Sequence, residues 1–360
     1  MATKAIPPTP RVEILANSGL SFIPAEFVRP QSERQHLQDS LNKNPCGVEI
    51  PIVDLGGFSS EEGRRRRCVE EVMAAAEEWG VMFLLNHGVP EELIERLQAT
   101  GKGFFELPVD EKEKYANDQS RGQIQGYGSK LANNENGILE WQDYFFHLVY
   151  PPEKTDLTVW PTEPADYIAT TTSFAKELRT LASKMFSILS LGFGLDQNKL
   201  EAELGGQDDL LLQLKINYYP PCPQPELALG VEAHTDVSSL SFILHNGIPG
   251  LQVFKNGAGW ITAPLVPNSI IVHVGDALEI ISNGRCHSVL HRGLVTKENV
   301  RISWAVFCEP PREKVVLRPL PELIGKGEVA RFEPRTFAEH LEGKLFKSRV
   351  EGCGEKAPVD

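Results

Sequence analysis

This 360-residue sequence lacks closely spaced cysteine pairs and long apolar runs, and it has fewer basic residues (36) than acidic ones (49). Its six cysteines form no Cys-x-x-Cys pair, which favours free thiols in a reducing compartment over a disulfide framework. No segment approaches the roughly 20 apolar residues of a membrane span, and the first ten residues lack the apolar core of a secretory signal. A formal net charge of −13 argues against nucleic-acid binding, which needs a basic surface. We therefore expect a cytoplasmic protein with no membrane span and no nucleic-acid partner.

The two halves of the chain differ in their hydrophobic periodicity. The first half predicts helices at residues 61–79, 91–105 and 165–191, and a short apolar strand at residues 81–88. From Leu211 onward, short apolar runs alternate with Pro, Gly and Asn clusters, which predicts many antiparallel strands. We expect one domain over residues 1–360, mainly β with flanking helices. Residues 1–200 would be mainly helical with the first strands, and residues 211–318 would form the β core that carries the catalytic site.

The segment from Asn117 to Gly137 is rich in Gly, Asn, Gln and Ser. Such a long irregular segment inside a domain is either a functional lid or disordered. The sequence leaves both interpretations open.

His234-Thr235-Asp236 places two ligand-capable side chains two positions apart, and in a strand these point to one face. Any of the other eight histidines could complete a metal site; His291 is the best placed, and His287 on the same predicted face is an alternative. Two imidazoles and one carboxylate on one face of an octahedron leave three positions open, as in non-haem Fe(II) oxygenases. By itself, His-x-Asp is a weak signal for metal.

Arg301 and Ser303 strengthen this hypothesis, because they lie ten and twelve residues after His291 and share a strand face. A guanidinium can hold a carboxylate through two parallel hydrogen bonds, and a neighbouring hydroxyl adds a third. This pair suits the remote carboxylate of 2-oxoglutarate. A hydrolytic zinc site is the alternative chemistry. It would want the carboxylate base of a His-Glu-x-x-His motif, which is absent, and it would leave Arg301 and Ser303 unexplained.

Together these motifs resemble the plant 2-oxoglutarate-dependent dioxygenases over residues 12–346, nearly the whole chain. The matching segments include WGVMFLLNHGVP, NYYPPCPQPELALGVEAHTD, LHRG and RISWAVFCEPP. KYANDQSRGQIQGYGSKLANN, EWQDYFFHLVYPPEK and LLLQLKINYY are most similar to the branch that oxidises leucoanthocyanidins. Flavonol synthases and flavanone 3-hydroxylases are the alternative branches.

The resemblance implies a double-stranded β-helix (jelly-roll) core and an oxidation of a small flavonoid substrate that consumes dioxygen and 2-oxoglutarate. It implies Fe(II) as the metal, with ascorbate to keep it ferrous. We expect the protein to be a monomer.

The resemblance also implies roles for individual residues. The implied iron ligands are His234, Asp236 and His291. The implied 2-oxoglutarate contacts are Arg301, Ser303, Asn217 and Tyr219. The implied flavonoid contacts are Tyr144, Phe146, Lys215, Phe307, Glu309 and Asn133.

Strand periodicity supports this grouping independently. Lys215, Asn217 and Tyr219 share one face of their predicted strand. Phe307 and Glu309 share a face with Arg301 and Ser303 on another. We therefore expect the cosubstrate and substrate residues to line one cavity, although plain core packing is an alternative role for the two phenylalanines.

Overall fold

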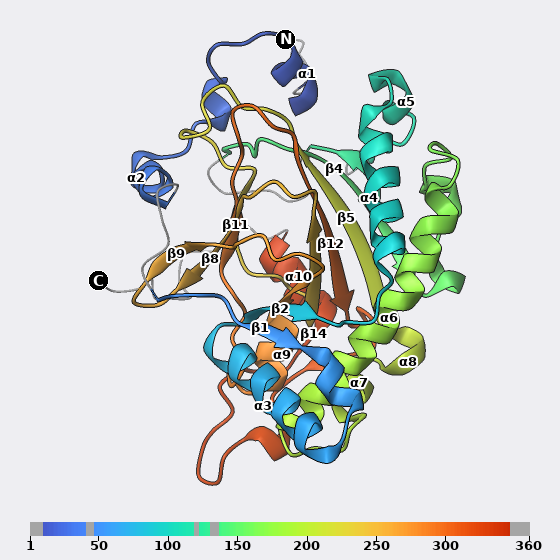
Figure 1. The fold of residues 1–360 in the computed structure, drawn as a ribbon, viewed down its shortest axis with the longest axis vertical. Coiled ribbons are helices and arrows are strands. Elements are labelled where there is room, and N and C mark those ends of the chain that lie inside the picture. The colour runs from blue at the N-terminus through green and yellow to red at the C-terminus, as the bar shows by residue number, and fades with distance from the viewer. Residues whose placement is uncertain (1–9, 41–46, 119–121, 130–136, 346–360) are drawn as a thin grey trace, which may run out of the picture.

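The computed structural model describes residues 10–40, 47–118, 122–129 and 137–345 (Figure 1). At its centre lies an eight-stranded sheet, in which only β1 and β2 pair in parallel among the described strands. In spatial order its strands are β1 (Ile52–Asp54), β2 (Val81–Leu85), β10 (Ile270–Val274), β7 (Leu240–His245), β12 (Arg301–Glu309), β5 (Leu211–Tyr219), β4 (Asp143–Tyr150) and β3 (Gly126–Gly128).

A second, four-stranded sheet faces the first. Its strands, in spatial order, are β6 (Val231–His234), β11 (His291–Gly293), β8 (Leu251–Lys255) and β9 (Gly259–Thr262). Side chains from both sheets meet in one buried cluster, which contains Phe83, Ile243 and Ile271 of the larger sheet and Val253 and Ile261 of the smaller. A small third sheet pairs β13 (Val316–Leu317) with β14 (Arg335–Thr336).

Helices cover the outer face of the larger sheet, where α4 and α6 lie alongside β4, β5 and β12 (Figure 1). The α-helices are α1 (Val12–Asn17), α2 (Gln31–Ser40), α3 (Glu62–Glu78), α4 (Glu91–Glu106), α5 (Val109–Glu113), α6 (Tyr167–Gly192), α7 (Lys199–Glu203), α8 (Gly206–Asp209), α9 (Asp276–Ile281) and α10 (Phe337–Leu345). Short 3-10 turns lie at Ala25–Phe27, Leu55–Ser59, Pro152–Lys154, Leu157–Val159 and Pro321–Leu323. Within the described residues, no helix is both long and apolar enough to cross a membrane.

Apolar side chains three or four residues apart form the buried face of α6; they are Phe174, Leu178, Leu181, Met185 and Ile188. In β5 and β12 the period is two, so Ile216 and Trp304 point outward into the core shared with the helices. Asn217 and Ser303, one position away in each strand, therefore point to the inner side between the two sheets. This alternation separates the apolar face that stabilises the fold from the face available for function.

The predicted helices agree with α3, α4 and α6 to within two residues at each end. The predicted strand at residues 81–88 is shorter than expected, since β2 ends at Leu85. The expectation that His234 and Asp236 share a strand is wrong: β6 ends at His234, and Asp236 lies in the segment that follows.

The segment from Asn117 to Gly137 is not wholly irregular, because β3 lies within it and pairs with β4. Its Gly-Tyr-Gly sequence has too few apolar residues to be recognised as a strand without its partner. Gly128 is required by close approach, since a Cβ there would lie 2.6 Å from the Tyr144 hydroxyl. The rest of the predicted lid or disordered segment, residues 119–121 and 130–136, lies outside the described residues.

Gly101 sets how closely α4 approaches the larger sheet, because a Cβ at this position would lie 2.4 Å from Trp304 Nε1. We expect Gly101→Ala to lower the free energy of unfolding by about 1–3 kcal/mol through overpacking. Gly63→Ala is the matched control, since this exposed glycine of α3 has nothing within 4 Å of the added Cβ. The control should gain up to about 1 kcal/mol from better helix propensity. Urea denaturation measures both, and equal effects would contradict the proposed packing.

Candidate metal centre

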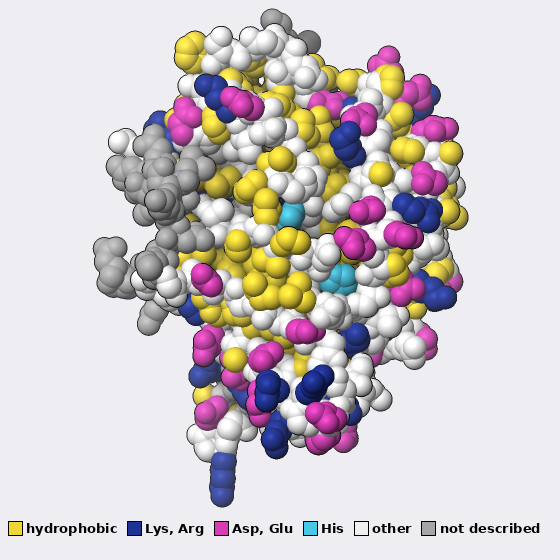
Figure 2. Space-filling model, in the orientation of Figure 1, with side chains coloured by type: hydrophobic (Ala, Val, Ile, Leu, Met, Phe, Trp, Pro, Cys, Tyr) yellow, Lys and Arg dark blue, Asp and Glu magenta, His cyan; other side chains and the backbone are white. Residues whose placement is uncertain are grey.

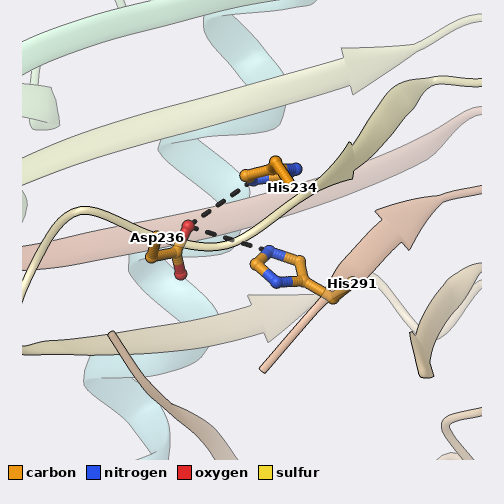
Figure 3. A group of neighbouring side chains, drawn as sticks. All are labelled: His234, Asp236 and His291. Atoms are coloured by element: carbon orange, nitrogen blue, oxygen red, sulfur yellow. Dashed lines mark ion pairs between the residues drawn. The ribbon is translucent and has the colours of Figure 1, made fainter. Parts of the chain in front are cut away.

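Two histidines and one aspartate converge where β6 and β11 pair. In this antiparallel pair His291 lies directly opposite His234. Asp236 Oδ1 lies 3.5 Å from His234 Nε2 and 3.7 Å from His291 Nε2 (Figure 3). One ligand-capable atom from each of the three residues lies within 4.8 Å of the others, a spacing that a single metal ion could bridge. His287 does not belong to this group, because it is exposed and its Nδ1 instead lies 3.7 Å from Glu279 Oε1.

Backbone carbonyls orient both imidazoles. His234 Nδ1 donates to the carbonyl of Glu232 at 2.8 Å, and His291 Nδ1 donates to the carbonyl of Val289 at 3.0 Å. Because a carbonyl can only accept, each Nδ1 carries a proton, and Nε2 is the nitrogen that faces Asp236 and would bind a metal. Metal-binding histidines in proteins are held in this way. The donor set and its orientation therefore fit a divalent metal ion.

Asp236 is buried, which alone would raise the pKa of its carboxyl group, yet that pKa lies well below its ordinary value. The nearby imidazoles of His291, His234 and His273 outweigh the cost of burial. Burial, followed by the charge of His234, lowers the pKa of His291 well below its usual range. The group therefore offers an ionised carboxylate and a neutral imidazole, the forms that bind metal.

On β12, a buried guanidinium has donors without a partner among the described residues. Arg301 is only 3% exposed, and its Nε and Nη1 have no hydrogen-bond partner among the described residues. Its guanidinium lies over the ring of Tyr219, 4.7 Å from the centroid, and Tyr219 is its partner across the β5–β12 ladder. Burying such donors without a partner is costly. The arrangement fits the carboxylate of a bound ligand.

Ser303 lies one inward position further along β12, directly opposite Asn217. Asn217 Nδ2 donates to Ser303 Oγ at 3.2 Å, and the Tyr219 hydroxyl lies 3.5 Å from the same oxygen. Gly250 gives Arg301 its space, because a Cβ there would lie 2.8 Å from Arg301 Cδ and its φ is +154°. Gly250 was not predicted as part of the site, since nothing in its local sequence pattern points to a side chain 51 positions away.

A further inward-facing set lies on β4, β5 and β12. Tyr144 pairs with Asn217 and Phe146 pairs with Lys215. Lys215 Nζ lies 5.0 Å from the centroid of the Tyr144 ring and forms no ion pair with the described residues. Burial lowers the pKa of this buried lysine. Its ammonium therefore has an aromatic neighbour and unused hydrogen-bond donors.

Glu309 is the last residue of β12 whose side chain faces inward, and it is buried. Phe307, two positions earlier on the same face, is half-buried. Gln213 Nε2 donates to the Glu309 carboxyl group. Burial raises the pKa of Glu309 to about 7, whereas Arg312 and Gln213 oppose this shift. Gln213 was not predicted as part of the site, although its position two residues before Lys215 places it on the same strand face. Asn133, the remaining predicted flavonoid contact, lies outside the described residues.

Figure 2 shows hydrophobic side chains grouped over the middle of one face, in front of the two sheets as oriented in Figure 1. Histidine side chains are visible among them, and most charged side chains lie toward the edge of this face. This distribution would favour the approach of a largely apolar molecule.

Comparison with known proteins adds a family match in both halves of the chain. Residues 211–310 match the 2OG-Fe(II) oxygenase superfamily, and residues 50–163 match the family described as non-haem dioxygenase in morphine synthesis N-terminal. The sequence is 60% identical to leucoanthocyanidin dioxygenase of Perilla frutescens over 99% of both chains. It is 43% identical to flavonol synthase/flavanone 3-hydroxylase of Arabidopsis thaliana, over 94% of this chain and 98% of that protein. The fold is similar to the crystal structure of JOX2 in complex with 2OG, Fe and JA, with a TM-score of 0.82 and 33% identity over 92% of each chain.

The raised pKa of Glu309 predicts a pH-dependent stability. Its pKa is about 7 in the folded protein against an ordinary value of 4.5, so its contribution is fully present below pH 4.5 and is lost as the pH rises through 7. Glu309→Gln keeps an acceptor for Gln213 but cannot ionise. We expect the variant to gain about 2–3 kcal/mol of unfolding free energy relative to wild type between pH 5 and pH 8. Denaturant unfolding at both pH values measures this, and a pH-independent difference would contradict the burial effect.

Proposed function

The chain belongs to the leucoanthocyanidin dioxygenase family of the 2OG-Fe(II) oxygenases, and we propose that it oxidises a leucoanthocyanidin to an anthocyanidin with 2-oxoglutarate and dioxygen as cosubstrates. The observation that carries the chemistry is the group of three ligand atoms within 4.8 Å, together with a buried guanidinium whose Nε and Nη1 have no partner among the described residues. The family match favours iron over the hydrolytic zinc alternative, which would leave Arg301 without a role.

His234, Asp236 and His291 would hold the iron as a two-histidine, one-carboxylate face. Bound iron supplies the dioxygen chemistry that side chains cannot perform, and the protein binds, orients and shields the reactants. The orientation of both imidazoles by backbone carbonyls supports this role, because neither ring needs to rearrange before binding.

Arg301 and Ser303 would bind the remote carboxylate of 2-oxoglutarate. The guanidinium offers parallel donors, and the Ser303 hydroxyl, which accepts from Asn217, would donate to the same carboxylate. Tyr219 would hold the guanidinium in place by lying against its flat face. Because these side chains lie on neighbouring strands, the cosubstrate would bind a rigid part of the sheet rather than a loop.

The inward residues of β4, β5 and β12 would bind the flavonoid. Tyr144, Phe146 and Phe307 offer aromatic surface to a flat polyphenol. Lys215 and Glu309 would form hydrogen bonds with its hydroxyl groups, since each is buried and has hydrogen-bonding capacity left. An unmatched substrate would leave these groups unpaired, which is a strong means of discrimination. We also propose Asn133 as a contact.

Several finer features also belong to this proposal. The two facing sheets and their strand order support a double-stranded β-helix (jelly-roll) core over residues 211–318 within a single domain, which β1–β4 of the first half join. We further propose that ascorbate keeps the iron ferrous, that the protein is cytoplasmic and that it acts as a monomer.

An anaerobically prepared protein supplied with Fe(II), 2-oxoglutarate and oxygen tests the function directly. We expect a leucoanthocyanidin to yield an anthocyanidin together with succinate, faster than a flavanone or a dihydroflavonol is converted. Chromatography of both products in one assay gives the result, and His234→Ala should abolish turnover in every case. A faster conversion of the flavanone or the dihydroflavonol would instead assign the chain to the alternative branches.

The two proposed subsites can be separated by a pair of substitutions, each serving as a control for the other. Arg301→Lys keeps the charge but loses the guanidinium fork, and should raise KM for 2-oxoglutarate about 10- to 150-fold, since a charge-assisted hydrogen bond is worth about 1.5–3 kcal/mol. Glu309→Ala should impair flavonoid oxidation while some succinate still forms without product. Steady-state kinetics for both substrates distinguish the two patterns. The assignment of residues to the two subsites would be wrong if each variant changed the kinetics of both substrates equally.

A further inference from the structure

Asp276, the first residue of α9, joins three separate segments next to the metal centre. Its backbone N–H donates to the carbonyl of Asp236 at 2.8 Å. Its Oδ1 accepts from Ser288 Oγ at 2.7 Å. Its Oδ2 accepts from His340 Nε2 at 3.0 Å and from Lys344 Nζ. Only 7% of the residue is exposed, so these partners replace most of the water that an ionised carboxylate requires.

Two of these contacts lead directly to proposed iron ligands. The Asp236 carbonyl belongs to a ligand itself. Ser288 immediately precedes Val289, whose carbonyl accepts from His291 Nδ1. The Asp276 backbone therefore holds the Asp236 segment, and its carboxylate holds the residue next to the group that orients His291.

The remaining contacts come from α10, near the C-terminal end of the described residues. Lys344 donates to Asp276 and also to Thr235 Oγ1, which lies between His234 and Asp236 in the chain. The helix thus contacts the ligand-bearing segment both directly and through Asp276. None of these residues is itself one of the ligands, and none lies on the inward faces of β4, β5 or β12.

We infer that Asp276 is a positioning residue for the iron centre, through which α10 holds the ligand-bearing segments in register. The inference rests on the proposed function, because it takes His234, Asp236 and His291 as the ligands. Partners of metal ligands act by restricting the ligands to one orientation, and their loss typically weakens metal binding about 10- to 100-fold.

The test measures metal affinity rather than turnover. Metal-free wild-type protein and its variants are titrated with Co(II) by calorimetry without oxygen, and the unfolding midpoint of each metal-free protein is recorded. We expect Asp276→Asn to weaken Co(II) binding by about 10- to 100-fold. Lys344→Met should weaken it in the same direction but less, since it removes one contact of the carboxylate and leaves His340 and Ser288 in place.

Asp209 provides the matched control, because its carboxylate also accepts from two lysines, Lys154 and Lys314, each at 2.7 Å. Asp209→Asn and Lys314→Met should leave Co(II) affinity unchanged. Unchanged affinity in Asp276→Asn, or a lower unfolding midpoint without a loss of affinity, overturns the inference. His234→Ala separates this failure from that of the proposed function: if it too binds Co(II) as wild type does, the assignment of the ligands itself is wrong.

Discussion

The pairing register of β5 and β12 is the constraint on which the rest of the site depends. Nine residue pairs align the two strands, from Arg301 opposite Tyr219 to Glu309 opposite Leu211. The outward residues, including Ile216 and Trp304, are buried against the helices. A slip by one residue would turn these apolar side chains inward and the polar ones outward, so packing on one face specifies which residues face the site on the other.

The inner face carries groups that the fold alone does not satisfy. Arg301 has unpaired donors, Lys215 has an aromatic neighbour but no ion pair among the described residues, and burial raises the pKa of Glu309. Such groups reduce stability when no ligand is present. The large apolar core between the sheet and the helices supplies the stability that tolerates them. A ligand with a carboxylate and several hydroxyl groups would satisfy them.

The metal centre uses a different part of the fold. Its histidines come from paired strands of the smaller sheet, whereas Asp236 comes from the segment after β6. None of the described strands pairs with that segment at Asp236, so its position depends on contacts such as the hydrogen bond from the Asp276 N–H. The cosubstrate and substrate residues are held by a sheet, and the metal ligands are held jointly by a sheet and by a network that reaches α10.

The sequence by itself determined the main helices, most strands and the shared faces of β5 and β12, because periods of 3.6 and 2 are local properties of the chain. Its spacing also singled out His234, Asp236 and His291, although it placed Asp236 in a strand. Only the tertiary structure decided the roles of Gly250, Gln213 and Asp276, and revealed β3. Gly250, Asp276 and β3 depend on a close approach between separate segments, which no local pattern records, whereas strand periodicity places Gln213 on the inner face but does not show its contact with Glu309.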